Sequence, residues 1–438
     1  MKIVKLLYLL GALLPLFHPC AGQNNPPQLK DIQVVTDTVA RQITITYSVA
    51  DKEEKKLRIS LKASADRGET YGLTTSTASG DLGFPVLTGK RKKIVWPYDS
   101  RLVKLTDLRI KLIADDLVKV DVATLVDQVD SNRIASTMAA IYGQRSHLTP
   151  QGLARLATVK DFIDKTFTDT GLEVSRQPFK FSKFEASNLF VKQAGLIDEA
   201  KTFIVCSYYN SSSAESFGAD ASASGMAGVL EAMRILTKYN FAHSLLFLAL
   251  DDIDEIESRG SAEFVYKGGI KETDQVQGAI CLDGIGHYSN EANSQILPSG
   301  IAEVFPQVFE TVKSNRFRGD FALSISNESS NPFTNRFMSV AAKLVPDLKI
   351  QSMVVPGNAE TMAALAEGDH VAFWYGKIPA LELSDGGITR KKDLVYDKIE
   401  DISYTFVSTV VKSVVAALAD MAEPQHSTAV VSGVTMKP

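Results

Sequence analysis

Residues 245–264, LLFLALDDIDEIESRGSAEF, run from a continuous apolar segment directly into a cluster of carboxylates. The six apolar residues at 245–250 have the composition of a strand buried on both faces, which is typical of parallel sheets. In an open parallel sheet, ligands bind beyond the carboxyl ends of the strands. We therefore expect the acidic residues after Leu250 to lie at a binding edge of the sheet.

Three further apolar runs have the same character, and helix-like segments separate them. The runs are TFIVC at 202–206, GAICL at 278–282 and IPALEL at 378–383. Between the first run and residue 245, residues 223–240 place their apolar side chains on one helical face. Strands that alternate with helices predict an α/β domain over residues 125–422, with a mostly parallel sheet covered by helices on both faces.

Residues 28–118 have a different pattern, in which short segments alternate apolar and polar residues with turn-rich stretches between them. This pattern predicts an antiparallel β-sandwich of the immunoglobulin-like type. Trp96 is expected to fill the core of the sandwich rather than to stack on a ligand. This region has no catalytic cluster, so we expect it to act as a spacer or as a contact surface for a protein or glycan partner.

The N-terminal segment has the features of a secretory signal. In residues 1–22, Lys2 and Lys5 precede about a dozen apolar residues and small residues follow. We expect a mature chain that begins near Gln23 and is exported to the periplasm or the cell exterior. Lipidation at Cys20 is the less favoured alternative, because the residues before it are a poor match to the small-residue box that lipidation needs.

The remaining composition is that of a globular protein with two cores. The chain has 438 residues and a net charge of -4, and nothing in it indicates nucleic-acid binding. No later segment is expected to span a membrane. Cys206 and Cys281 lie in apolar strand-like runs, so we expect buried thiols rather than a disulfide. Residues 423–438 are expected to form a loose tail.

Polar side chains follow each predicted strand of the α/β domain. Tyr208 and Asn210 come after the first strand, the acidic residues 251–255 after the second, and Asp283 after the third, while Asp220 precedes a helix. Each has an ordinary alternative as a helix-cap, first-turn or turn residue. Carboxylates gathered at one edge repel one another unless a cation or protons compensate, so together they predict a metal site.

Five sequence blocks resemble the M28 metallopeptidases, exported di-zinc aminopeptidases and carboxypeptidases whose relatives include glutaminyl cyclases. The blocks are IVCSYYNS, GADASASGMAGVLEAMRIL, LLFLALDDIDEIESRGSAEF, AICLDGIG and GDHVAFWYGKIPALEL. YGQRSHLTPQGLARLATVKDFI, before them, is similar to the arginine-containing loop and first long helix of the family. The resemblance covers nearly all of the α/β domain and implies its fold.

The resemblance also implies site residues, several of which depart from the family pattern. Among the metal ligands it implies Asp220, Glu255 and Asp283, whereas the two histidine ligands correspond to Tyr208 and Thr389. The catalytic glutamate corresponds to Asp254, with Asp252 as a competing candidate. The remaining implied positions are Asn210 for a supporting aspartate, Asp393 for a later aspartate, and Asp369 and His370 as pocket-lining residues.

Loss of both imidazoles divides the functional expectation in two. The resemblance implies zinc if the protein is active, whereas an oxygen-only ligand set suits calcium, magnesium or manganese, or holds no metal. We expect a non-hydrolytic protein that binds a peptide or amino-acid derivative in the crevice. The alternative is an active aminopeptidase with a rearranged or single-metal centre, for which His287 or His370 are the candidate replacement ligands; His147 is expected to be a loop residue.

Overall fold

The structure is a computed structural model. It describes residues 24–68, 71–99, 101, 104–181, 183–211, 213–252, 260–360, 362, 365–386 and 397–434.

The N-terminal region forms two antiparallel four-stranded sheets, with strand orders β1-β2-β6-β4 and β16-β7-β3-β5. Alternate residues of both sheets meet in one core, in which Trp96 is 2% exposed, as expected for a core residue. The immunoglobulin-like type stays a prediction. The strands are β1 (Gln28–Asp37), β2 (Gln42–Ala50), β3 (Lys56–Ser64), β4 (Ser79–Gly80), β5 (Gly83–Leu87), β6 (Gly89–Pro97), β7 (Arg109–Lys119) and β16 (His426–Val434).

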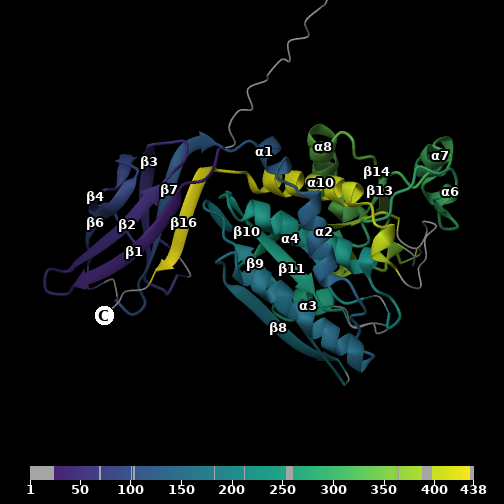
Figure 1. Cartoon of the computed structure of the whole chain (residues 1–438), viewed down its shortest axis with the longest axis horizontal. Coiled ribbons are helices and arrows are strands. Elements are labelled where there is room, and N and C mark those ends of the chain that lie inside the picture. Colours follow the sequence, from purple (N-terminus) through teal and green to yellow (C-terminus); the bar gives the residue numbers. More distant parts are fainter. Residues whose placement is uncertain are drawn as a thin grey trace, which may run out of the picture.

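The expectation of a loose C-terminal tail is wrong, because residues 426–434 form strand β16 of this region (Figure 1). Strand β16 pairs with β7 in antiparallel register, with Val431 opposite Leu112. The main-chain groups of β7 would otherwise be unpaired along this edge, which is costly for a strand in a sheet. Thr428 also bonds the side chain of Asn240 in the α/β region, so β16 contacts both regions.

The α/β region is built on one eight-stranded sheet of order β14-β13-β15-β12-β10-β11-β9-β8. Its four central strands, β15, β12, β10 and β11, are parallel, whereas antiparallel pairs flank them, so the sheet is mixed. The strands are β8 (Val174–Phe181), β9 (Phe184–Gln193), β10 (Asp198–Tyr208), β11 (His243–Leu250), β12 (Gln275–Leu282), β13 (Ala322–Asn327), β14 (Ile350–Val355) and β15 (Ala380–Ser384).

Helices cover both faces of this sheet, as the sequence predicts (Figure 1). Val205 of β10 points into the core formed with α4 and α10, and Cys206 points into the opposite core with α5 and α9. The helices are α1 (Val122–Val126), α2 (Ser131–Ile141), α3 (Pro150–Thr168), η1 (Ala219–Ser224), α4 (Gly225–Leu236), α5 (Gly260–Tyr266), α6 (Ile301–Val304), α7 (Pro306–Ser314), η2 (Glu328–Ser330), α8 (Asn331–Leu344), α9 (His370–Tyr375), η5 (Ile399–Asp401) and α10 (Tyr404–Ala422).

Helix α10 is the central helix of the larger core. By length and hydropathy alone it could cross a membrane, a property that the sequence analysis did not assign to any later segment. In the fold, 78% of its apolar window is buried against protein. Its apolar residues therefore serve the core, where it packs on α1, α2, α4 and α8.

We predict that a chain ending at Ala422 is less stable than a chain ending at Val434. Removing β16 exposes the edge of β7 and the core residues beneath it, which should lower the free energy of unfolding by at least about 2 kcal/mol. Urea unfolding of the two chains measures this difference. Equal midpoints would contradict a structural role for β16.

Candidate functional site

The carboxyl ends of the central parallel strands lie level with one another at one edge of the sheet. Tyr208 of β10 is opposite Leu250 of β11, and Leu282 of β12 is opposite Leu383 of β15. The chain continues from these strands directly into acidic residues, namely Asp251, Asp283 and, one residue beyond Ser384, Asp385. The register of the parallel strands thus gathers polar side chains at this edge, as expected for a ligand-binding crevice.

Tyr208 and Asp283 form a direct hydrogen bond across neighbouring strands. The Tyr208 hydroxyl donates to Asp283 Oδ1 at 3.1 Å. Removal from solvent, and then the charges of Glu382 and Asp369, raise the pKa of Asp283 well above its usual range. The pKa of Tyr208 is also raised, first by burial and then by Asp283. Both shifts favour the uncharged forms of the two groups.

Asp220 is presented by an irregular turn that precedes α4. Residues 219–224 form one π-helical segment, a form often found at functional sites, after Gly218 at φ 59°. The Asp397 carboxylate accepts the Asp220 and Ala221 backbone N–H groups at 2.8 and 3.0 Å. These two hydrogen bonds fix the backbone at Asp220 and thereby the direction of its side chain. Asp220 is 0% exposed.

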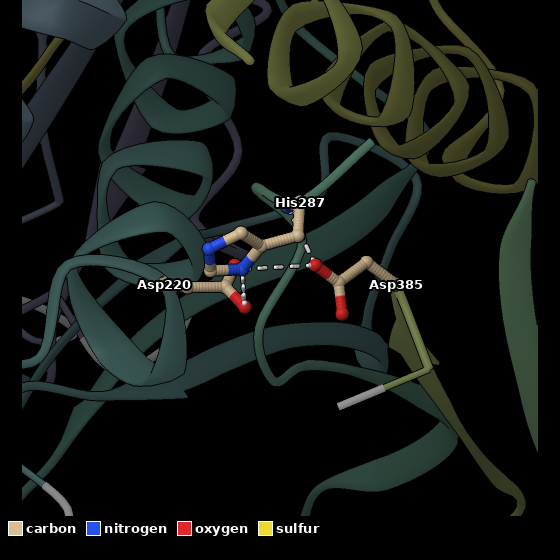
Figure 2. Close-up of side chains that lie close together, drawn as sticks. All are labelled: Asp220, His287 and Asp385. Atoms are coloured by element: carbon tan, nitrogen blue, oxygen red, sulfur yellow. Dashed lines mark hydrogen bonds and ion pairs between the residues drawn. The ribbon is translucent and has the colours of Figure 1, made fainter. Parts of the chain in front are cut away.

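The Asp220 carboxylate meets His287 and Asp385 in a buried cluster (Figure 2). Asp220 Oδ1 accepts from the Gly286 N–H at 2.6 Å, and Asp220 Oδ2 lies 2.7 Å from His287 Nδ1. Asp385 Oδ2 accepts from the His287 N–H at 2.5 Å and lies 3.6 Å from Nδ1. The imidazole therefore sits between two carboxylates, and a protonated ring would offset part of their charge.

These three side chains have the donor types of a zinc site but the spacing of a hydrogen-bonded cluster. One ligand atom from each lies within 4.8 Å of the others. Two tetrahedral zinc ligands would lie about 3.3 Å apart, given zinc bonds of roughly 2.0–2.2 Å to nitrogen and oxygen. The 2.7 Å between Nδ1 and Oδ2 is shorter than this. To bind one cation together, Nδ1 and Oδ2 would have to separate by at least about 0.6 Å.

Asp369, His370 and Glu382 form a second polar group against the same strands. His370 Nδ1 lies 2.7 Å from Glu382 Oε2. The His370 ring packs edge-on against the Trp374 ring, with 4.4 Å between the ring centroids. His370 is 1% exposed and Asp369 is 6% exposed. In the described structure these two residues are therefore buried beneath the edge, not exposed at its rim, although the charge of Asp369 raises the pKa of Asp283.

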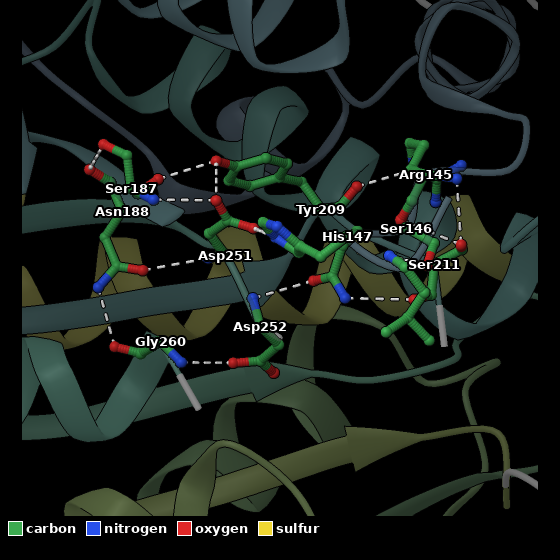
Figure 3. Close-up of polar contacts among 12 residues, drawn as sticks. Arg145, Ser146, His147, Ser187, Asn188, Tyr209, Ser211, Asp251, Asp252 and Gly260 are labelled. Carbon is green, nitrogen blue, oxygen red and sulfur yellow. Dashed lines mark hydrogen bonds and ion pairs between the residues drawn. The ribbon is translucent and has the colours of Figure 1, made fainter. Parts of the chain in front are cut away.

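Polar side chains close the base of the loop that joins β11 to α5 (Figure 3). The Asp252 N–H donates to Asn210 Oδ1 at 2.9 Å, and Asp252 Oδ1 accepts from the Gly260 N–H at 2.6 Å. Asn188 accepts from the Asp251 N–H at 3.1 Å and donates to the Gly260 carbonyl at 2.8 Å. The two ends of the loop are therefore joined directly, through Asp252 and Gly260, and indirectly, through Asn188.

Asp251 has structural partners and is not part of the candidate metal cluster. Its Oδ1 lies 2.9 Å from Nε2 of His147, and its Oδ2 accepts from the Tyr209 hydroxyl at 3.0 Å and the Ser187 N–H at 2.9 Å (Figure 3). The sequence analysis placed His147 in a loop, and it is a buried one. The fully buried Arg145 beside it bonds several backbone carbonyls and fixes that loop.

The comparisons with known proteins identify the family. The model of peptidase family M28 matches residues 188–418, which is more than half of the chain and contains every central strand of the sheet. This chain belongs to peptidase family M28.

One curated protein and two solved structures are among the proteins that are similar to this chain. The Escherichia coli (strain K12) uncharacterized protein YfbL is 26% identical over an alignment of 271 residues, and the match covers 59% of this chain and 78% of that protein. The aminopeptidase from Aneurinibacillus sp. strain AM-1 superimposes with a TM-score of 0.51 and 11% identity, over 70% of this chain and 97% of that one. The glutaminyl cyclase from Macrostomum lignano matches with a TM-score of 0.49 and 15% identity, over 69% and 93%.

The structure brings part of the expected M28 ligand set together. Tyr208 bonds Asp283, and Asp220 is near enough to contribute to the raised pKa of Asp283. Asn210 lies beside them as a backbone anchor. The remaining expected residues lie outside the described residues, and they are Asp254, Glu255, Thr389 and Asp393.

The structure adds two residues, His287 and Asp385, to the expected ligand set, because both lie with Asp220 in the candidate metal cluster. The sequence analysis considered His287 as a replacement ligand but did not consider Asp385. A signal for Asp385 was present, because SDGG follows the apolar run IPALEL just as DGIG follows GAICL. In both segments an aspartate followed by a glycine, Asp283 in the first and Asp385 in the second, comes just after a buried strand.

We predict that Asn188→Ala destabilises the base of the β11–α5 loop. The substitution leaves the Asp251 N–H and the Gly260 carbonyl without their buried partner, which should cost about 1–3 kcal/mol for each group left unpaired. Urea unfolding measures this cost. Ser187→Ala is the matched control, because that hydroxyl makes one long contact of 3.5 Å. Equal effects of the two substitutions would contradict the assignment.

Proposed function

We propose that this protein is an exported member of family M28 that binds a peptide or amino-acid derivative at the carboxyl edge of its sheet without hydrolysing it. The observation that carries the proposal is the 3.1 Å hydrogen bond from Tyr208 to Asp283. By the family resemblance, these two positions hold a histidine and an aspartate that are metal ligands. Here a phenol, a poor neutral ligand, bonds that carboxyl group directly.

The surroundings of Asp283 support the same proposal. Burial, and then the charges of Glu382 and Asp369, raise the pKa of this carboxyl group well above its usual range. A metal would have to displace the Tyr208 hydroxyl from it. The Tyr208 hydrogen bond therefore gives Asp283 a partner of its own at this position.

The environment of Asp220 also opposes a two-metal centre. Both of its carboxylate oxygens already have partners, the Gly286 N–H at 2.6 Å and His287 Nδ1 at 2.7 Å. To bridge two cations, Asp220 would exchange these short hydrogen bonds for metal bonds. Buried polar groups that lose their partners cost free energy, so His287 and Gly286 would need new ones.

The edge offers hydrogen-bonding groups to a ligand. Tyr208 and Asp283 remain partly accessible there. The amino or amide groups of a peptide or amino-acid derivative would hydrogen-bond to them. A protein or glycan contact through the β-sandwich is part of the proposal, supported by the half-exposed Phe84 and Leu87 on edge strand β5.

A second candidate function is a hydrolase with a single metal. The cluster of Asp220, His287 and Asp385 favours it, because one imidazole and two carboxylates are an ordinary zinc ligand set. A zinc ion held there would polarise a carbonyl group and lower the pKa of a bound water. Calcium, magnesium or manganese would be less well suited to the imidazole nitrogen.

We predict that the purified mature chain retains little zinc after zinc loading and gel filtration, and that it hydrolyses no aminoacyl or peptide substrate in a zinc-dependent manner. Elemental analysis of wild type, Asp220→Ala and His287→Ala separates the alternatives. One zinc per chain, lost in both variants, would establish the single-metal site. Two zinc ions, lost in Asp220→Ala and retained in His287→Ala, would establish the family centre and overturn the proposal.

We also predict that Tyr208→His increases zinc retention over wild type. The substitution removes the phenol from Asp283 and supplies the nitrogen donor that zinc prefers. Tyr208→Phe is the matched control, since it removes the hydroxyl group and adds no donor. If Tyr208→His and Tyr208→Phe retain the same amount of zinc as wild type, Tyr208 is not what limits metal binding at this edge.

A further inference from the structure

Two cysteines lie side by side on neighbouring strands in the centre of the sheet. Cys206 of β10 is the register partner of Cys281 of β12, and their Sγ atoms lie 3.3 Å apart. The two side chains are 0% and 2% exposed. They are the only cysteines of the expected mature chain, because the third, Cys20, lies in the signal segment.

The backbone geometry permits a bond between them. Paired strands lie about 4.8 Å apart, which is inside the Cα separation of roughly 4.4–6.8 Å that disulfides span. The sulfur atoms would have to approach by a little more than 1 Å to reach the bond length of about 2.05 Å. Small rotations of the two side chains about their Cα–Cβ bonds supply such a movement without moving a strand.

Both cysteines are free and buried in the structure, as the sequence analysis expects. From their proximity we nevertheless propose that Cys206 and Cys281 are oxidised to a cross-strand disulfide when the chain folds in an oxidising compartment. Two thiols at this distance in a chain with no other mature cysteine have each other as their one intramolecular partner. Export, the premise of this proposal, places the chain where disulfides form and persist. The inference goes beyond the proposed ligand binding and does not depend on it.

The bond forms by thiol–disulfide exchange during folding. One cysteine thiolate attacks the disulfide of a thiol–disulfide oxidoreductase, giving a mixed disulfide, and the thiolate of the other cysteine displaces the oxidoreductase. The two thiols lose two protons and two electrons, and the oxidoreductase leaves as its dithiol. Burial raises the pKa of both thiols in the folded sheet, so the exchange belongs to the stage before β10 and β12 are covered.

The position of the bond gives it a local effect on the candidate site. Side chains two residues apart on a strand share one face, so Tyr208 and Asp283 lie directly beyond Cys206 and Cys281 on the same face. A disulfide would hold β10 and β12 together one step below the Tyr208–Asp283 hydrogen bond. It would thereby fix the spacing between Tyr208 and Asp283.

The test compares the mature chain directed to an oxidising compartment with the same chain produced in a reducing cytosol. Each is denatured in the presence of an alkylating agent, and its intact mass and peptide map are measured. We expect the exported chain to take up no alkyl group, so that its mass is two hydrogen atoms below the mass calculated for the reduced chain. Its peptide map should contain a linked pair of peptides with Cys206 and Cys281. The cytosolic chain should take up two alkyl groups.

The double variant Cys206→Ala with Cys281→Ala is the control for stability. We expect reductant to lower the urea midpoint of the exported wild-type chain and to leave that of the double variant unchanged. If the exported wild-type chain folds but takes up two alkyl groups after denaturation, the proposal is overturned. Because thiols are counted on denatured protein, this result is independent of zinc content and of ligand binding.

Discussion

The burial of negative charge at one edge of the central sheet is the constraint on which the rest of the site depends. Six carboxylates that are at most 8% exposed lie in the described part of this region, together with the partly buried Asp283. They are Asp220, Asp251, Asp369, Glu382, Asp385 and Asp397. Each needs a proton, a cation or hydrogen-bond donors, because an isolated buried charge is too costly to keep. In the described structure, protein groups meet much of this need.

The compensation uses three kinds of partner. Histidines face the carboxylates of Asp220, Asp251 and Glu382. Backbone N–H groups approach closely where glycine permits, as at Gly286, where an added Cβ would lie 2.8 Å from Asp220 Oδ1. A phenol meets Asp283. In the proposed binding function, these hydrogen-bond donors take the place of the metal ions that the family resemblance implies.

Much of this arrangement could be predicted from the sequence. The apolar runs predicted the central strands, and the polar residues after them predicted the edge at which Tyr208, Asp220 and Asp283 meet. The partners of Asp220 could not be predicted in the same way, since the contacts with His287 and Asp385 depend on how two turns after separate strands fold. The mixed flanks of the sheet depend on strand order, which periodicity does not encode.

Strand β16 gives the order of synthesis a physical consequence. The sheet formed by β3, β5 and β7 gains its last strand only when His426 pairs with Lys119, after more than 300 further residues have been made. At translation rates of about 5–20 residues per second, β7 waits roughly 15 to 60 seconds for its partner. During that interval an unpaired strand edge is open to other chains. The first region to emerge is therefore among the last to be completed, and its edge needs protection until the chain end arrives.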